Sequence, residues 1–238
     1  MKSIRTQLII LILAAVLPAL GVIVYSNYER QRLDLAKAQD NTLIMVQSLA
    51  NDHENDVEVI RRLLMILVKL PALQNRDAAA CNRLFKELVK DYDRYTNIYA
   101  ADQAGEIFAN ALPSVKINIK YRKHFQDAVR TKSFSVGEFT IGPVSRRAVL
   151  PFAYPLTDPA GRVKGIVAVS LDLDKYGRYF ASTSALSKGT TLNLLDRNFT
   201  CLYRHPDNEK YVGRTDLPAM MKHLSAAPRE GIFTATGV

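Results

Sequence analysis

An uncharged, apolar run near the N-terminus constrains this chain more than any other feature. Residues 8–25 carry no charged side chain and follow Lys2 and Arg5. A helix over this run is roughly 27 Å long at about 1.5 Å per residue, close to the hydrocarbon thickness of a bilayer. We therefore predict a transmembrane helix at 8–25, preceded by a cytoplasmic N-terminus at 1–7, because the positive charges come first. The alternative is a cleaved signal peptide, whose apolar part is normally shorter.

The next segment, residues 27–70, is rich in helix formers and poor in turn residues. Apolar residues recur in it at steps of three, four or seven, at Leu43, Val46, Ala50, Val57, Ile60, Leu64 and Leu67. This spacing predicts a long amphipathic helix that ends at Pro71. Its apolar face either packs on a domain or forms the seam of a parallel homodimer.

Beyond Pro71 the sequence predicts an α+β fold, an antiparallel sheet with helices on one side. The expected elements are a helix at 77–92, strands at 97–101 and 106–109 joined by a turn, a helix at 121–131, and strands at 134–141, 148–156 and 163–173. A shorter, similar pattern follows, with strands at 190–195 and 199–204, a helix at 217–226 and a strand from 231 to 236. We predict an internal repeat, with a membrane-distal module at 71–180 and a membrane-proximal module at 181–238.

Composition excludes several classes of function. The chain has 32 Lys and Arg against 23 Asp and Glu, but the surplus is spread along it, which does not indicate a nucleic-acid partner. Cys81 and Cys201 are too few for a disulfide framework, and we expect two unpaired thiols, with a single bridge as the alternative. The histidines have no metal-ligand spacing, and there is no nucleophile elbow or phosphate-binding glycine loop. We therefore expect no catalytic site, metal or cofactor in this chain.

The order of several short motifs resembles the double Cache sensor domain, a PAS-like extracytoplasmic domain of bacterial transmembrane receptors. The motifs are Asn97–Asp102 with Gly105, Tyr121–Phe125, Phe134–Glu138, Ala153–Asp158 and Gly161–Val167, within a resemblance that covers about 27–238. It implies sensing of a small molecule outside the inner membrane and signalling to a cytoplasmic output module that lies beyond Val238. We expect a histidine kinase as that output, with a diguanylate cyclase or a chemoreceptor as alternatives.

The resemblance also implies a ligand site in the distal module. Arg122 matches an arginine of the family and would pair with a carboxylate through its planar fork. His124 replaces a usual aromatic residue, and Tyr154 lies on the strand expected to floor the pocket. Ser170 stands where amino-acid-binding members place an aspartate for the ligand ammonium, and Asp172 shares its face of the strand. We predict a small organic acid without an α-amino group as the ligand, bound by Arg122, His124, Tyr154, Ser170 and Asp172.

Each of these residues also has a purely structural interpretation, as a surface arginine, a buried histidine or tyrosine, or a strand end. A function from another class also stays open, a membrane-anchored module that binds protein in adhesion. A cavity with converging polar groups beside Arg122 would favour sensing, and a sealed module would favour protein binding.

Overall fold

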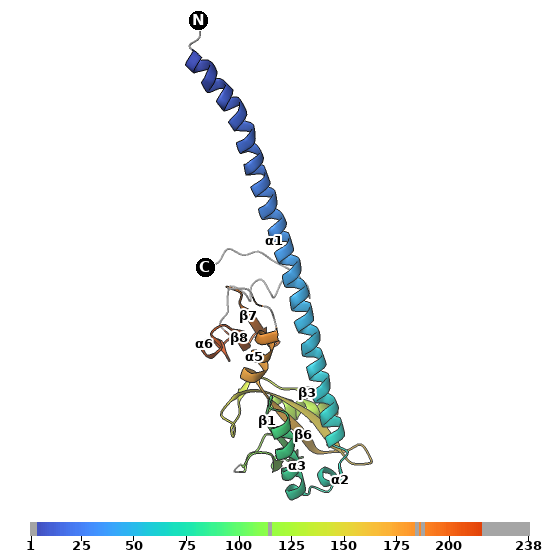
Figure 1. The fold of residues 1–238 in the computed structure, drawn as a ribbon. Helices are drawn as coiled ribbons and strands as arrows, with labels where there is room; N and C mark the ends of the chain where they lie inside the picture. Colours follow the sequence, from blue (N-terminus) through green and yellow to red (C-terminus); the bar gives the residue numbers. More distant parts are fainter. Residues whose placement is uncertain (1–3, 114–115, 184–185, 187–188, 216–238) are drawn as a thin grey trace. The chain divides into compact units, whose positions relative to one another are not determined.

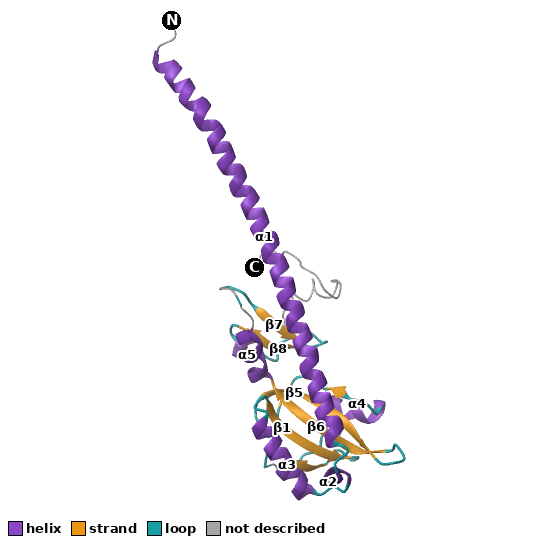
Figure 2. Cartoon of the chain, turned by 45° about the vertical axis from the view of Figure 1, so that its right-hand side comes forward, coloured by secondary structure: helices purple, strands orange, loops and turns teal. Residues whose placement is uncertain are grey.

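The computed structural model describes residues 4–113, 116–183, 186 and 189–215. The described residues fall into two compact units, one of residues 4–50 and one of the described residues from 51 to 215. The described elements are α1 (Ile4–Leu67), α2 (Pro71–Gln74), α3 (Ala78–Asp91), β1 (Tyr95–Asp102), β2 (Ile107–Asn110), α4 (Lys123–Thr131), β3 (Ser135–Val136), β4 (Thr140–Ile141), β5 (Ala148–Thr157), β6 (Val163–Asp172), α5 (Leu173–Thr183), β7 (Leu192–Leu195), β8 (Cys201–His205) and α6 (Asn208–Tyr211). Figure 1 follows them along the chain, and Figure 2 colours them by type.

Helix α1 is one continuous helix that contains both the apolar run and the predicted amphipathic segment. It ends at Leu67, three residues before the predicted end at residue 70, and Pro71 opens the short helix α2. Of the predicted apolar positions, Ile60 and Leu64 are buried, whereas Val46 is 49% exposed. The apolar stripe therefore supplies core residues in the last turns of the helix.

The predicted membrane-spanning segment at 8–25 lies within α1. Among the residues that the structure describes, no helix combines the length and the hydropathy that a membrane crossing requires. The prediction of a transmembrane helix at 8–25 is therefore not supported.

A six-stranded sheet forms the centre of the larger unit. Its strands follow the order β2-β1-β6-β5-β3, with β4 also paired to β5, and every pairing is antiparallel. The predicted hairpin of β1 and β2 is confirmed, and Asp102 accepts hydrogen bonds from the amides of Ala104 and Glu106 in its turn. Gly105 in this turn has a φ of +86°, and a Cβ there would lie 2.6 Å from the amide nitrogen of Lys120. Both the positive φ and the close approach require glycine at this position.

The strand predicted at 134–141 is divided into β3 and β4. Both pieces pair with β5. Strand β3 lies opposite Phe152 and Ala153, and β4 lies opposite Ala148 and Val149. The break lies opposite Pro151, which has no amide hydrogen to continue the ladder. A backbone hydrogen bond remains there: the Gly137 amide donates to the Pro151 carbonyl at 2.8 Å.

Helices cover both faces of this sheet, which corrects the prediction of helices on one side. On one face, Phe125 and Ala128 of α4 join a buried cluster with Tyr99, Ala153 and Ala168. The opposite face carries the alternate strand residues, and the end of α1 lies against it. Ile60 borders a hollow with Leu171, and Met65 borders another with Tyr154. Helix α4, which lies between β2 and β3 in the chain, thus covers one face, and the end of α1, which precedes the strands, covers the other.

The segment predicted as a second module, 181–238, is described only in its first part, and the predicted arrangement of two modules is not confirmed. Strands β7 and β8 form a separate two-stranded antiparallel sheet, which confirms the predicted hairpin. Helix α5, which the sequence did not predict, precedes it and packs against β8, where the Gly177 backbone approaches the ring of Tyr203. The helix predicted at 217–226 and the strand predicted at 231–236 lie outside the described residues. Cys81 and Cys201 are buried and unpaired.

Candidate functional site

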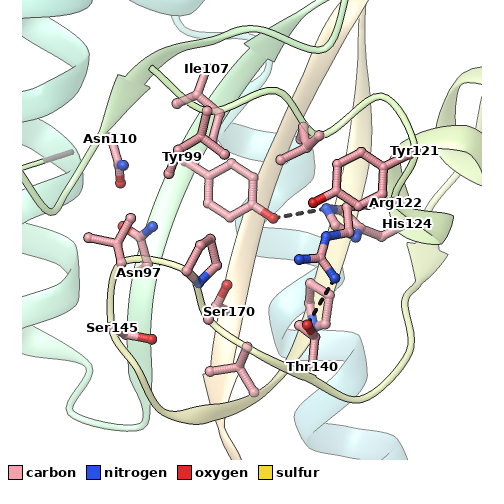
Figure 3. A pocket seen from close by; sticks show the side chains of 17 residues that line it. Asn97, Tyr99, Ile107, Asn110, Tyr121, Arg122, His124, Thr140, Ser145 and Ser170 are labelled. Atoms are coloured by element: carbon pink, nitrogen blue, oxygen red, sulfur yellow. Dashed lines mark hydrogen bonds between the residues drawn. The ribbon is translucent and has the colours of Figure 1, made fainter. Parts of the chain in front are cut away.

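A small cavity lies on the α4 face of the sheet, beneath the loop that follows β4 (Figure 3). It encloses about 80 Å³. This volume holds a few water molecules and is well below the several hundred Å³ of sites for drug-sized ligands. Its lining combines apolar residues with the polar side chains of Asn97, Tyr99, Arg122, His124, Thr140 and Ser170.

The strand periodicity explains why these residues meet. Asn97 of β1, Ser170 of β6 and Pro151 of β5 stand opposite one another in the register. Cross-strand partners share one face of a sheet, so all three project toward the cavity. Tyr99 lies two residues after Asn97 and therefore shares this face.

Arg122 enters the cavity from the start of α4. It is the N-cap residue, with extended backbone angles of φ −78° and ψ 137°, and its carbonyl accepts hydrogen bonds from the amides of Phe125 and Gln126. Its side chain makes no capping bond. The guanidinium lies 4.9 Å from the centre of the Tyr121 ring and donates to the Thr140 hydroxyl at 2.9 Å. Its hydrogen-bond partner is thus neutral.

A buried polar chain crosses the floor of the cavity. The Tyr99 hydroxyl lies 2.9 Å from Nε2 of His124. Burial, assisted by the positive charge of Arg122, lowers the pKa of His124 from 6.5 to about 3. Burial likewise raises the pKa of the Tyr99 hydroxyl. Both side chains are therefore neutral near pH 7 and available as hydrogen-bonding groups.

The charge of the cavity is consequently positive. None of the described side chains that line it is an aspartate or glutamate, and Arg122 is its charged member. Elsewhere in the same unit arginines do have acidic partners: Arg130 pairs with Asp127 at 2.7 Å and Arg162 with Asp158 at 2.8 Å. A partly buried cation that lines a cavity and has no acidic partner among the described residues favours an anionic ligand.

The loop over the cavity, residues 142–147, is closed by its own backbone. The Gly142 amide donates to the Arg147 carbonyl at 2.8 Å, and the Arg146 amide donates to the Gly142 carbonyl at 2.9 Å. Val144 and Ser145, at the centre of this loop, line the cavity. The loop thus screens Arg122 and Ser170 from bulk solvent.

The comparisons with known proteins agree with this architecture. No family model and no curated protein matches the chain. Solved structures do match: the ligand-binding domain of the Campylobacter jejuni chemoreceptor Tlp3 in complex with L-valine is 16% identical, with a TM-score of 0.59 over 77% of this chain and 76% of that chain. The ligand-binding domain of the Pseudomonas aeruginosa amino-acid chemoreceptor PctC in complex with GABA is 18% identical, with a TM-score of 0.56 over 75% and 78%. The chain has the fold of a receptor sensor domain.

The extracellular domain of the putative histidine kinase mmHK1S-Z2 also shares this sensor fold, at 13% identity and a TM-score of 0.58 over 74% of this chain and 75% of that chain. The sensor fold that the sequence motifs implied is therefore confirmed. At these identities the likeness concerns the fold, so the ligand chemistry has to be argued from the cavity itself.

The sensor fold brings together three of the five predicted site residues. Arg122, His124 and Ser170 line the cavity. Tyr154 does not: it pairs with Val167, on the other face of the sheet, and borders a separate hollow with Met65 and Val68. The prediction placed Tyr154 by its strand without fixing which face it occupies, and a shift of one residue reverses the face.

Asp172 is also outside the cavity lining. It is the last residue of β6, only 1% exposed, and its carboxylate accepts hydrogen bonds from the amides of Asp174 and Lys175 at the start of α5. It also forms an ion pair with Arg147. These contacts account for its burial as the cap of α5.

Asn97, Tyr99 and Thr140 line the cavity but were not predicted as site residues. The alternation along β1 was available in the sequence and places Asn97 and Tyr99 on one face. Which face carries the cavity depends on where α4 and the loop at 142–147 pack, and local sequence does not specify this. Thr140 could be found only through its hydrogen bond to Arg122.

Proposed function

We propose that this chain is the extracytoplasmic sensor region of a signal-transducing receptor, and that its cavity binds a small organic acid through the carboxylate. The sensor fold supports the first part, because ligand-binding domains of chemoreceptors and extracellular domains of histidine kinases share it. A histidine kinase remains the expected output. A cavity lined by converging polar groups supports the second part over a protein-binding adhesion module, for which we expected a sealed face beside Arg122.

The observation that carries the ligand class is the state of Arg122. Its side chain is partly buried, borders the cavity, and has the neutral Thr140 hydroxyl as a hydrogen-bond partner. A carboxylate in the cavity would match the planar guanidinium with two parallel, charge-assisted hydrogen bonds. It would also neutralise the charge of a lining without acidic side chains. His124 and Ser170, both neutral, would hydrogen-bond the remaining ligand atoms.

Signalling through α1 completes the proposal. The last turns of α1 are part of the sensor unit, where Arg94 pairs with Asp56 at 2.9 Å and His53 contacts the Tyr176 hydroxyl at 2.7 Å. We propose that ligand binding favours one arrangement of these contacts and shifts α1 in a homodimer at the inner membrane. A ligand shifts such an equilibrium only by its difference in affinity for the two arrangements.

Calorimetric titration of short organic acids into the wild-type chain and Arg122→Ala tests the ligand class. We expect Arg122→Ala to weaken binding by about 2–5 kcal/mol, which is about 30-fold or more, because the buried carboxylate loses its charged partner. Arg122→Lys should also bind more weakly, since a point charge replaces the two-pronged fork. Arg130→Ala is the matched control, because Arg130 belongs to the same helix but is 73% exposed and paired with Asp127.

Equal affinity for the wild-type chain and Arg122→Ala would remove Arg122 from the site. If no organic acid binds to the folded wild-type chain at millimolar concentration, the proposed function is wrong, and the protein-binding alternative becomes the better explanation of the fold.

A further inference from the structure

We propose that the ligand is a small hydroxy acid, whose carboxylate pairs with Arg122 and whose hydroxyl donates a hydrogen bond to Oδ1 of Asn97. This inference rests on the proposed function and specifies the chemical class of the ligand further. It starts from one unsatisfied atom of a residue that lines the cavity.

Asn97 is the residue that carries the inference. It is 8% exposed, and its Oδ1 is the buried side-chain polar atom that lacks a hydrogen-bond partner within the part of the chain that the structure describes. Buried polar groups are nearly always hydrogen-bonded, and one that is not requires an explanation. Asn97 also lines the cavity, and a rotation of its side-chain amide as the ligand binds would bring this oxygen to a donor on the ligand.

The position of Asn97 sets where the donor must lie. Asn97 stands opposite Ser170 in the strand register, while Arg122 comes from the start of α4. Figure 3 shows Asn97 and Arg122 on opposite sides of the cavity, with Ser170 between them. A ligand that places its carboxylate at Arg122 therefore directs its other end toward Asn97 and Ser170.

The charge of the cavity decides between two kinds of donor. An ammonium group at this end would bury a full positive charge, which requires an acidic partner. No aspartate or glutamate lines the cavity in the described chain, His124 is neutral, and the charged group nearby is the like-charged Arg122. A hydroxyl is a neutral donor, and it can accept in return from Ser170.

The size of the cavity limits the ligand further. About 80 Å³ leaves room for a few non-hydrogen atoms. A hydroxyl is the smallest neutral group that both donates and accepts, whereas a carboxamide is larger. A hydroxy acid of three or four carbon atoms meets the requirements of charge, donor and size together.

The test compares matched acids that differ at one group. Calorimetric titration would measure propionate, each enantiomer of lactate and alanine, and then butyrate, 3-hydroxybutyrate and 3-aminobutyrate. The titrated chains are the wild type, Asn97→Ala, Asn97→Asp and the control Asn198→Ala, which alters an exposed asparagine in the turn before β8. Affinity ratios within one variant do not depend on how much of that variant is folded.

In the wild type we expect a hydroxy acid to bind at least about tenfold more tightly than the matched acid without the hydroxyl, and more tightly than the amino acid. In Asn97→Ala the hydroxyl preference should fall to about one, while Asn198→Ala keeps the wild-type ratio. Asn97→Asp should move the preference toward the amino acid, because its carboxylate supplies the missing partner for an ammonium.

Two results would overturn this inference. One is a wild-type preference for the amino acid, and the other is a hydroxyl preference that persists unchanged in Asn97→Ala. If the plain acids still bind in a manner that depends on Arg122, only the hydroxy-acid inference fails. If none of these acids binds to the wild type, the proposed function fails together with it.

Discussion

The two faces of the six-stranded sheet are built from the same strands, but different groups fill the space above them. The face toward α1 carries Ile98, Phe152 and Val169, all fully buried apolar residues. The face toward α4 is also apolar around Phe125, but it is lined by polar residues around Arg122. Ile98, Phe152 and Val169 have no polar side-chain group that needs a partner, whereas Asn97 on the second face has a side-chain oxygen without a hydrogen-bond partner among the described residues. The difference separates residues that maintain the fold from the residues that we propose bind a ligand.

A substitution on the apolar face should cause the largest loss of stability. Leu64 of α1 is fully buried, so Leu64→Ala should lower the free energy of unfolding by about 2–5 kcal/mol through lost burial and the remaining cavity. Urea unfolding would measure this loss. Ile66→Ala, on the same helix but 62% exposed, is the control and should cost much less. Similar losses for both variants would contradict the packing of α1 described above.

The polar face should make the protein sensitive to acid. The pKa of His124 is about 3 in the folded chain and near 6.5 when unfolded, so the unfolded chain binds the additional proton between these values. The stabilisation is therefore complete above about pH 6.5 and is lost as the pH falls toward 3. Between pH 7 and pH 4 this loss should be about 3 kcal/mol.

Urea unfolding of the wild type and His124→Gln at several pH values isolates this contribution from that of the carboxylates. His124→Gln should lose less stability than the wild type over the same pH interval, because glutamine does not titrate. Parallel pH dependence of the two proteins would show that His124 is not buried in its neutral form.

A substitution at Asn97 should change the free energy of unfolding by a smaller amount and in the opposite direction. Asn97→Leu should raise the free energy of unfolding of the ligand-free chain by about 1–3 kcal/mol, because it removes a buried, unpaired oxygen. Thermal melting without ligand measures this gain. A loss of stability in Asn97→Leu would indicate that Oδ1 has a partner in the free protein, which would weaken the hydroxy-acid inference.

Tyr154 should give the smallest effect. It lies on the face toward α1, so Tyr154→Phe should change the free energy of unfolding by no more than about 0.5 kcal/mol and leave the affinity for organic acids unchanged. Tyr99→Phe is the matched comparison on the opposite face. It removes the hydroxyl bonded to His124 and should alter both quantities. A binding defect in Tyr154→Phe would place Tyr154 in the site after all.

The sequence by itself determined the local elements. The turn residues between Asp102 and Gly105 predicted the hairpin of β1 and β2, and the apolar spacing before Pro71 predicted the long helix. The order of several short motifs, among them the one around Arg122, indicated the sensor fold. These signals are local because backbone conformation and side-chain period depend on near neighbours.

Only the tertiary structure decided which of these residues meet. Tyr154 and Pro151 are three residues apart on β5, yet one borders α1 and the other borders the cavity, because alternation separates the faces and packing assigns them. The carboxylate of Asp172 has the chemistry to bind a ligand, but it caps α5, a helix that the sequence did not predict. The side-chain oxygen of Asn97 is without a hydrogen-bond partner only because no donor in the folded surroundings reaches it. Burial, pairing and the lack of a partner are properties of the assembled chain, since residues distant in sequence supply the surroundings.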